Sequence, residues 1–397
     1  MAIQNLEHYD MSAARGYLCR HDAGGVSLPG NWADLANIAM RLPDILPSGQ
    51  IRSHLEGQLP AAELLDVSAL TNPQARTAMV HVSFMVQAYV WGAPDAPVSL
   101  PSCLAVPMVA LADRLGQQPL LPYSGYVLDN WDRLDPNGPI DLDNIYMIQN
   151  FLAGQDEAWF VLIHVAIEAR AGEALNAFAP IVMACEENNI ASVQCQLESM
   201  AGVWEDINHI FDRMPERCDP YIYFERVRPY IHGWKDNPAL PTGIIYEGVE
   251  KFDGVPQAFR GQTGSQSSIV PAMDALLGIG HAADPLKAYL DQLHIYRPPS
   301  HRAFIDDVRA SSGLRDFVQT AQHKGLADAY NGIVQAVADF RSRHLEYAAS
   351  YINKQNRHAA GNDTDVGTGG TPFMRYLKKH RDETAANLIS VPSRVVA

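Results

Sequence analysis

Apolar residues recur every three or four positions along most of this chain, and stretches in which apolar and polar residues alternate are few. The first spacing is typical of helices with one apolar face, whereas alternation is typical of half-buried strands. The spacing predicts helices over residues 32–41, 71–92, 106–115, 155–171, 173–187, 192–214, 268–277, 285–293, 300–309, 327–354 and 372–387. We therefore expect an all-α protein.

Prolines and glycines mark where helices end. An N-cap aspartate followed by proline begins a helix at residue 219, and Pro229 must end or kink it. The densest turn signal is the sequence PNGP at residues 136–139. Because 397 residues exceed the usual size of one domain, we expect a smaller N-terminal domain over residues 1–150 and a larger helical domain over residues 151–397.

The composition is that of a globular protein, and it argues against several classes. Lys and Arg number 30 against 45 Asp and Glu, a formal net charge of −15, which disfavours binding to nucleic acid or to an anionic membrane. No apolar run of about 18 residues predicts a transmembrane helix, and the first residues do not resemble a signal peptide. The five cysteines form no Cys-x-x-Cys pair, so a disulfide framework, a zinc ribbon and an iron–sulfur cluster are disfavoured. We expect a cytoplasmic protein.

His344 is a candidate metal ligand on the longest predicted helix. It follows Val337 by seven residues and Phe340 by four, and it precedes Ala348 by four. It therefore falls on the apolar stripe that faces the interior. A histidine there can hold a haem iron, and Arg341, one turn earlier, can reach a haem propionate. The alternative is a hydrogen-bonded core histidine.

His164 and Arg228 are candidate substrate-binding residues. His164 lies in the middle of the most apolar predicted helix, where burial keeps an imidazole neutral and able to accept a proton or a hydrogen bond. Arg228 follows Phe224 by four residues, so a guanidinium and an aromatic ring share a face that can bind a small carboxylate. The alternatives are a core histidine bonded to a backbone carbonyl and a surface arginine paired with Glu225 or Asp219.

Two segments are rich in small residues. The sequence GQTGSQSS at 261–268 lacks the Gly-Lys-Ser/Thr of a phosphate loop, but its backbone can approach a flat ligand closely. A plain loop is the alternative. The sequence GTGGT at 367–371 ends a polar segment, 361–371, that is either a flexible linker or a mobile lid over a ligand. The helix predicted after it favours the lid.

Several motifs occur in an order that is specific although no single motif is. They are RPYIHGWKDNP, YEGV, FRGQTGSQSS, MDALLGIG, YRPPSHRAF, LRDFV, RSRHLEY and GTGGTPFMRYLK, with LPYSGYVLDNW and WFVLIHVAIE upstream. Together they resemble the indoleamine 2,3-dioxygenase family, haem enzymes that open the indole ring of tryptophan. The resemblance is densest between residues 220 and 377, and the first hundred residues add little.

The resemblance implies an all-α enzyme with one haem b per chain, whose smaller N-terminal domain covers the distal side of the haem. By position, His344 matches the family's axial haem ligand and Arg341 its propionate-pairing arginine. Thr263 and Gly264 fall in a loop over the haem edge, and Arg228 matches the arginine that holds the substrate carboxylate. The other substrate-binding positions that the resemblance implies are Tyr123, Tyr126, Phe160, Tyr223, Phe224, Gly264 and Thr368.

Three residues depart from the family pattern. Tyr223 replaces a phenylalanine and Tyr126 a smaller residue. His164 stands where vertebrate members have a small hydroxyl residue, whereas the related tryptophan 2,3-dioxygenases place a distal histidine against the indole N–H. The resemblance implies cleavage of L-tryptophan, or a related indoleamine, by O₂ to N-formylkynurenine, with an electron donor that keeps the iron ferrous. The alternatives are a haem monooxygenase acting on an indole or related aromatic and a non-catalytic O₂-binding haem protein.

Overall fold

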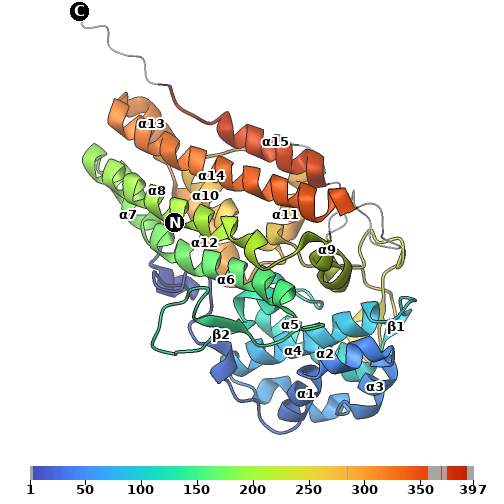
Figure 1. Cartoon of the computed structure of the whole chain (residues 1–397). Coiled ribbons are helices and arrows are strands. Elements are labelled where there is room, and N and C mark those ends of the chain that lie inside the picture. The colour runs from blue at the N-terminus through green and yellow to red at the C-terminus, as the bar shows by residue number, and fades with distance from the viewer. Residues whose placement is uncertain (1–2, 284, 356–367, 369–372, 391–397) are drawn as a thin grey trace, which may run out of the picture.

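The computed structural model describes residues 3–283, 285–355, 368 and 373–390, and it confirms the all-α prediction (Figure 1). The helices of the N-terminal part are α1 (Asn31–Ala39), α2 (Leu42–Ile45), α3 (Ile51–Gln58), α4 (Asn72–Trp91) and α5 (Ser102–Leu115). Those of the C-terminal part are α6 (Gln155–Asn176), α7 (Phe178–Glu186), α8 (Ile190–Asp212), α9 (Pro220–Ile222), α10 (Ile269–Leu277), α11 (Pro285–His294), α12 (Pro299–Ser311), α13 (Leu314–Ala321), α14 (Lys324–Tyr351) and α15 (Phe373–Ala385).

The strands of the described part are short and occur in pairs. Strand β1 (Ser99–Leu100) lies parallel to β4 (Ile245–Tyr246), and β2 (Trp131–Arg133) is antiparallel to β3 (Ile145–Met147). The PNGP sequence at 136–139, predicted as a domain boundary, lies in the loop between β2 and β3. The division into two domains therefore stays a prediction.

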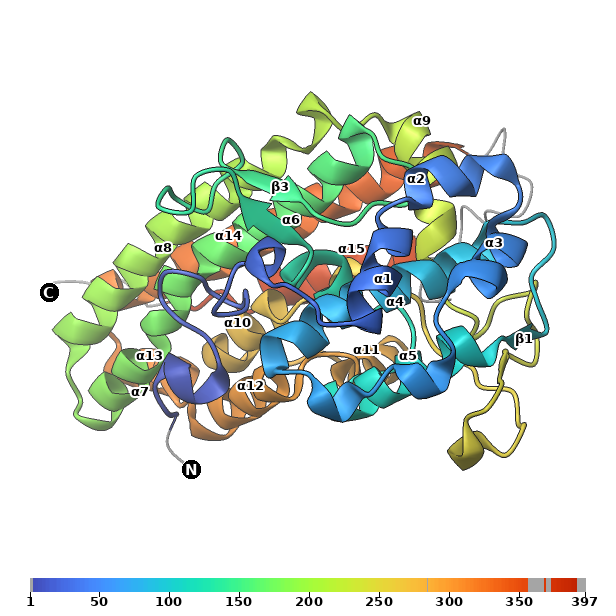
Figure 2. The ribbon, with the colours of Figure 1, turned by 90° about the horizontal axis from the view of Figure 1, so that it is seen from below.

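Helix α4 is the centre of the N-terminal part. Thr71 and Gln74 form a capping box at its start, which satisfies backbone N–H groups that have no partner within the helix. Its residues are buried on nearly every side, as expected of a helix that is apolar all round. It packs against α1, α3 and α5. Seen from below, these helices lie in front of the C-terminal ones (Figure 2).

The long helices of the C-terminal part form layers. Helix α14 packs against α8 and α15, and α8 packs against α6. Figure 1 shows these layers one above another, with α4 and α5 beneath α6. Apolar side chains from both parts join one cluster that reaches from Leu6 to Ile389. No described helix combines the length and the apolar character that crossing a membrane requires.

The N-terminal segment crosses α6 at two glycines. Gly16 has φ +55°, and a Cβ there would overlap the carbonyl oxygen of Glu168. On the helix, a Cβ at Gly172 would lie 2.7 Å from Gly16 N and 2.8 Å from Ser12 O. Glycine at both positions permits this approach, so the segment lies directly on a helix that carries part of the site.

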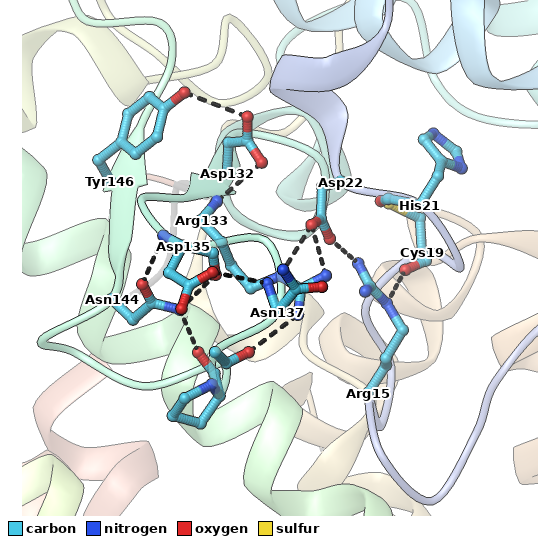
Figure 3. Close-up of polar contacts among 12 residues, drawn as sticks. Arg15, Cys19, His21, Asp22, Asp132, Arg133, Asp135, Asn137, Asn144 and Tyr146 are labelled. Atoms are coloured by element: carbon cyan, nitrogen blue, oxygen red, sulfur yellow. Dashed lines mark hydrogen bonds and ion pairs between the residues drawn. The ribbon is translucent and has the colours of Figure 1, made fainter.

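Asp22 fastens the same segment to the β2–β3 hairpin (Figure 3). Its Oδ1 lies 2.7 Å from Arg15 Nη2, and its Oδ2 lies 2.7 Å from Arg133 Nη2. Burial opposes ionisation of this carboxyl, but hydrogen bonds from the two arginines outweigh it and lower the pKa of Asp22. The ion pairs hold the N-terminal segment in place over α6.

Some helix ends differ from the prediction. Helix α5 begins at Ser102, before the predicted start, and contains Pro107 in its interior. The boundary between the helices predicted over 155–171 and 173–187 lies later than expected, since α6 extends to Asn176. Pro180 explains this division, because its ring would clash with the carbonyl of residue 176 in a continuous helix. The apolar spacing does not predict α2, α3 or α13.

Two turns with i→i+5 hydrogen bonds interrupt the regular helices. In residues Ser124–Leu128, the N–H of Asp129 donates to the carbonyl of Ser124 at 2.8 Å. In residues Tyr223–Val227, the N–H of Arg228 donates to the carbonyl of Tyr223. The second turn follows α9 and leads into a 3₁₀ turn that contains Pro229, so the prediction that this proline ends the helix is confirmed.

Candidate active site

Two adjoining cavities lie among α6, α8, α14, α15 and the loop that precedes α10. Their volumes are about 130 Å³ and about 300 Å³. The residues that line both are His164, Phe211, Gly264, Ser265, His344 and Leu377. A ligand that fills both cavities therefore lies beside both candidate histidines.

His344 projects from α14 onto the wall of both cavities. Burial, with the neighbouring His164 and Arg341 as smaller contributions, lowers its pKa to about 4. The imidazole is therefore neutral at pH 7 and keeps a lone pair for a metal. It has no hydrogen-bond partner among the described residues, and its ring centroid lies 6.5 Å from that of Phe211. These features disfavour the hydrogen-bonded core histidine that was the alternative.

His164 projects from α6 onto the same walls. Its Nδ1 lies 2.7 Å from the carbonyl oxygen of Phe160, and its ring centroid lies 4.7 Å from the Phe160 ring. Burial lowers the pKa of His164, so the ring is neutral. Because a carbonyl only accepts, Nδ1 carries the hydrogen and Nε2 is left as an acceptor. The sequence analysis treated a bond to a backbone carbonyl and a role in ligand binding as alternatives for His164. In the structure, His164 bonds to the Phe160 carbonyl and also lines the cavities.

Aromatic residues from α6, α8, α14 and the 223–227 turn line the smaller cavity. Phe160 and Tyr223 line it, with ring centroids 4.7 Å apart. Tyr126 lies behind Phe160, with centroids 6.4 Å apart, and does not line either cavity. Tyr123 lines the larger cavity instead. The smaller cavity thus offers flat apolar walls of the kind that cover an aromatic ligand.

Arg228 and Phe224 lie one layer behind these walls. Both are fully buried, and neither lines the two cavities. The Arg228 guanidinium carbon lies 5.4 Å from the Phe224 ring centroid, and its charge opposes the rise that burial causes in the pKa of Tyr223. Arg228 therefore lies near Tyr223, which lines the smaller cavity, but does not line the cavity itself.

The predicted loop of small residues lies where the two cavities meet. Thr263 caps a 3₁₀ turn, Gly264–Gln266, and lines the smaller cavity. A Cβ built on Gly264 would have no atom within 4 Å, so the space beside this backbone is open. Thr368 lines the smaller cavity and donates from Oγ1 to Gln262 O at 2.6 Å. The rest of the predicted lid at 361–371 lies outside the described residues.

Basic side chains line the larger cavity. Arg341 lines it, and its Nη2 lies 2.7 Å from Asp274 Oδ2. Arg297 also lines it and donates to Ser265 O at 2.7 Å. Burial lowers the pKa of Arg297 to about 10, so it remains charged at pH 7. Arginines on this wall can form hydrogen bonds to carboxylate groups of a ligand.

Glu168 and Arg297 are cavity residues that the sequence reasoning missed. Tyr123 and Ser267 each donate a hydroxyl to Glu168 Oε1 at 2.7 Å. Burial raises the pKa of Glu168 to about 7, against the effect of these hydrogen bonds and of Arg297. Glu168 follows His164 by four residues, so the shared helix face was a usable signal. Arg297 follows an irregular segment, and no spacing points to it.

Comparison with known proteins identifies the family. A sequence model described as indoleamine 2,3-dioxygenase matches residues 5–387. The chain is 32% identical to indoleamine 2,3-dioxygenase 1 of Rattus norvegicus, over 98% of this chain and 96% of the relative. The chain belongs to the indoleamine 2,3-dioxygenase family. It is also 31% identical to indoleamine 2,3-dioxygenase 2 of Homo sapiens, over 97% and 96% of the two chains, and 30% identical to indoleamine 2,3-dioxygenase of Saccharomyces cerevisiae, over 88% and 86%.

Haem b is the cofactor of the indoleamine 2,3-dioxygenase family, and the described residues fit it. His344 offers a neutral nitrogen at the cavity wall. The open space beside Gly264 accepts a flat group close to the backbone, and Arg297 and Arg341 stand where acidic substituents can be neutralised. The family's cofactor and the chemistry of this wall agree.

Proposed function

We propose that this chain uses haem b and O₂ to cleave the C2–C3 bond of the indole ring of L-tryptophan, giving N-formylkynurenine. One observation carries the proposal. In a member of the indoleamine 2,3-dioxygenase family, two neutral histidines from different helices, His344 and His164, line the same pair of cavities. A metal ligand and a hydrogen-bond acceptor are then available on the walls of one site.

We assign His344 as the residue that holds the haem iron. Arg341 and Arg297, which line the larger cavity, would pair with the propionates, and Thr263 and Gly264 would contribute the backbone close to the haem. When bound, the haem supplies the chemistry that activates O₂. The chain's own residues position the substrate, exclude water and hold protons. An electron donor that keeps the iron ferrous completes the proposed system.

The smaller cavity is the proposed site of the indole ring. Phe160 and Tyr223 form its flat walls, and His164 Nε2 accepts a hydrogen bond from the indole N–H. We propose that Arg228 holds the substrate carboxylate and that the Thr368 hydroxyl lies near the ammonium group. Because Arg228 does not line the smaller cavity, this arrangement requires the 223–227 turn to rearrange when substrate binds.

The mass of the product made from L-tryptophan and ¹⁸O₂ tests the reaction. We expect a product heavier than tryptophan by two labelled oxygen atoms. A product that carries one labelled atom would identify a monooxygenase. Absence of any labelled product, with the haem spectrum intact and the iron reduced, would identify an O₂-binding protein without catalysis. Either of these results contradicts the proposal.

Replacing Arg228 tests the carboxylate contact. A hydrogen bond to a charged group is worth about 1.5–3 kcal/mol, so Arg228→Ala should raise KM for L-tryptophan roughly ten- to a hundredfold. Tryptamine has no carboxylate, and its KM should change much less. Arg226→Ala is the matched control, because this neighbouring side chain is exposed. Equal effects on the two substrates would contradict the assigned contact.

A further inference from the structure

At the edge of the larger cavity, three potential metal ligands meet between α15 and the segment that follows α10. His380 and Glu383 lie on α15, and His281 lies on the segment opposite. One ligand atom from each of the three side chains lies within 4.8 Å of the other two. We propose that these residues form a binding site for a divalent transition-metal ion of the zinc type, independent of the haem.

The positions of the three side chains allow them to coordinate one metal ion. His380 and Glu383 are three residues apart, so they project from the same face of the helix. His281 Nδ1 lies 2.7 Å from Glu383 Oε2, and the two imidazole rings have centroids 4.3 Å apart at an interplanar angle of 30°. Ligands at zinc bond lengths of about 2.0–2.2 Å in a tetrahedron stand roughly 3.3 Å apart. Admitting the ion requires small side-chain rotations and the release to solvent of the proton that His281 Nδ1 donates to Glu383 Oε2.

The surroundings of His281 support a metal ligand. Its other nitrogen, Nε2, lies 3.2 Å from Asp274 Oδ2, and Asp274 Oδ2 is held in turn by Arg341 Nη2 at 2.7 Å. Histidines that bind metals commonly donate their second N–H to a carboxylate, which fixes the ring and raises its basicity. Here that carboxylate already orients Nδ1 toward Glu383.

The cluster is sheltered, and only one of its three residues reaches a cavity. The side chains of His281 and Glu383 are 10% and 19% exposed, far less than those of ordinary surface charges. His380 borders the larger cavity, whereas His281 and Glu383 do not. Two histidines and one carboxylate give three protein ligands, and water can fill the fourth position.

The proposed ion has a structural consequence. The N–H of Ala282 already donates to Glu383 Oε1 at 3.3 Å, and a metal ion adds bonds between the same two segments. Helix α15 also carries Leu377, which lines both cavities. The ion thus holds in place a helix that forms one wall of the site, and its loss loosens that wall without removing any cavity residue.

Zinc binding by the tag-free haem protein tests the proposal. The protein is dialysed against Zn²⁺, and zinc and iron are measured by elemental analysis. We expect zinc in a stoichiometric ratio to the chain, in addition to the haem iron. Glu383→Gln, which keeps the shape of the side chain, and His380→Gln should each weaken zinc binding at least about tenfold. His209→Ala is the control, because His209 is exposed on α8 and is not one of the three clustered residues.

Stability provides a second measurement. Zn²⁺ should raise the thermal midpoint of the wild-type protein and of His209→Ala, but not that of Glu383→Gln or His380→Gln. Far-UV circular dichroism checks that the variants are folded, and either variant alone suffices for the comparison. The proposal is overturned if the wild-type protein binds no stoichiometric zinc, or if both folded variants bind it as tightly as the wild-type protein. Neither measurement depends on enzymatic activity, so the proposed function can fail or succeed separately.

Discussion

Burial sets the chemistry of the two histidines on the cavity walls. An imidazole taken out of water loses the hydration of its charged form, so its pKa falls. This effect lowers the pKa of His344 to about 4 and also lowers that of His164. The first ring therefore has a lone pair for iron over the whole physiological pH range. The second can accept a hydrogen bond without adding a positive charge to the site.

Replacing His164 tests the role proposed for it. His164→Ser removes the Nε2 acceptor but keeps a small polar side chain at this position. A hydrogen bond worth about 1 kcal/mol would lower kcat/KM for L-tryptophan roughly fivefold. The absorption spectrum of the haem should keep the signature of its axial histidine. If that signature is lost, His164 itself is the iron ligand, and the assignment of His344 is wrong.

A methylated substrate provides the control for this variant. 1-Methyltryptophan lacks the indole N–H, so the wild-type protein and His164→Ser should process it at similar rates. A variant that is slowed equally on both substrates would show that His164 acts by packing alone.

At the level of single residues, the sequence predicts the cavity wall better than the layer behind it. His344 and His164 were accessible because helical spacing shows which side chains face inward. The depth of Arg228 was not, because a shared face with Phe224 does not reveal that both are fully buried and do not line the cavity. Burial depth depends on neighbours that are distant in the sequence.

Among the helices, two irregular turns lie beside the regular helices that build the site. The turns at Ser124–Leu128 and Tyr223–Val227 both contain i→i+5 bonds, and such turns are frequent at functional sites. The second directs Tyr223 toward the smaller cavity. Prolines predicted that the helix would end near residue 229, but they could not predict the extra residue in the turn.

The start of helix α6 makes stability depend on pH. Glu157 Oε1 and Oε2 accept from the N–H groups of Phe151 and Leu152 at 2.9 and 3.3 Å. Burial nevertheless raises the pKa of Glu157 from 4.5 to about 7. The folded state therefore binds this proton more tightly than the unfolded state. Its contribution to stability is fully present below pH 4.5 and is lost as the pH rises through 7.

Glu157→Gln removes this titration. As the pH rises from 5 to 8, the free energy of unfolding of the variant should increase relative to that of the wild-type protein, by up to about 3 kcal/mol. Thermal midpoints measured at both pH values give the comparison. Glu173→Gln is the control, since this carboxylate lies on the same helix but is exposed. A difference between Glu157→Gln and the wild-type protein that does not change with pH would contradict the assignment.

Two glycines on different helices should respond in opposite ways to alanine. Gly332 lies in the interior of α14, and a Cβ there would have no atom within 4 Å. Gly332→Ala should therefore stabilise the protein by about 0.5–1 kcal/mol. On α6, a Cβ at Gly172 would meet the backbone of residues 12–16, and Gly172→Ala should cost about 1–3 kcal/mol. Thermal midpoints of both variants check the signs, and a gain at Gly172 would contradict the close approach.

At the scale of the whole molecule, the fold class could be predicted and the arrangement of the helices could not. Long helices such as α4, α6, α8 and α14 have several apolar periods, so spacing identifies them. Helices α2, α3 and α13 are too short to repeat the pattern. Helix α14 packs against α8 and α15, which lie in distant segments of the chain. The spacing of apolar residues within one helix does not predict such contacts.

The N-terminal and C-terminal parts of the chain both contribute residues to the larger cavity. We therefore expect the two parts to unfold together. Tyr123 from the N-terminal part bonds to Glu168 on α6, and His344 on α14 lines the same larger cavity. A ligand that binds only the folded state stabilises everything on which its site depends. Added hemin should raise the thermal midpoint of the apoprotein. Loss of haem absorbance and loss of helical circular dichroism should then occur in a single transition.

His344→Ala separates the effect of iron ligation from general binding of hemin. This variant should retain little haem after gel filtration and show no rise in midpoint, because the neutral nitrogen that holds the iron is gone. His209→Ala should behave as the wild-type protein, since His209 is exposed on α8. The helical signal could instead be lost in two steps, with haem released only in the later one. Residues 1–150 would then form a domain that unfolds independently of the haem site.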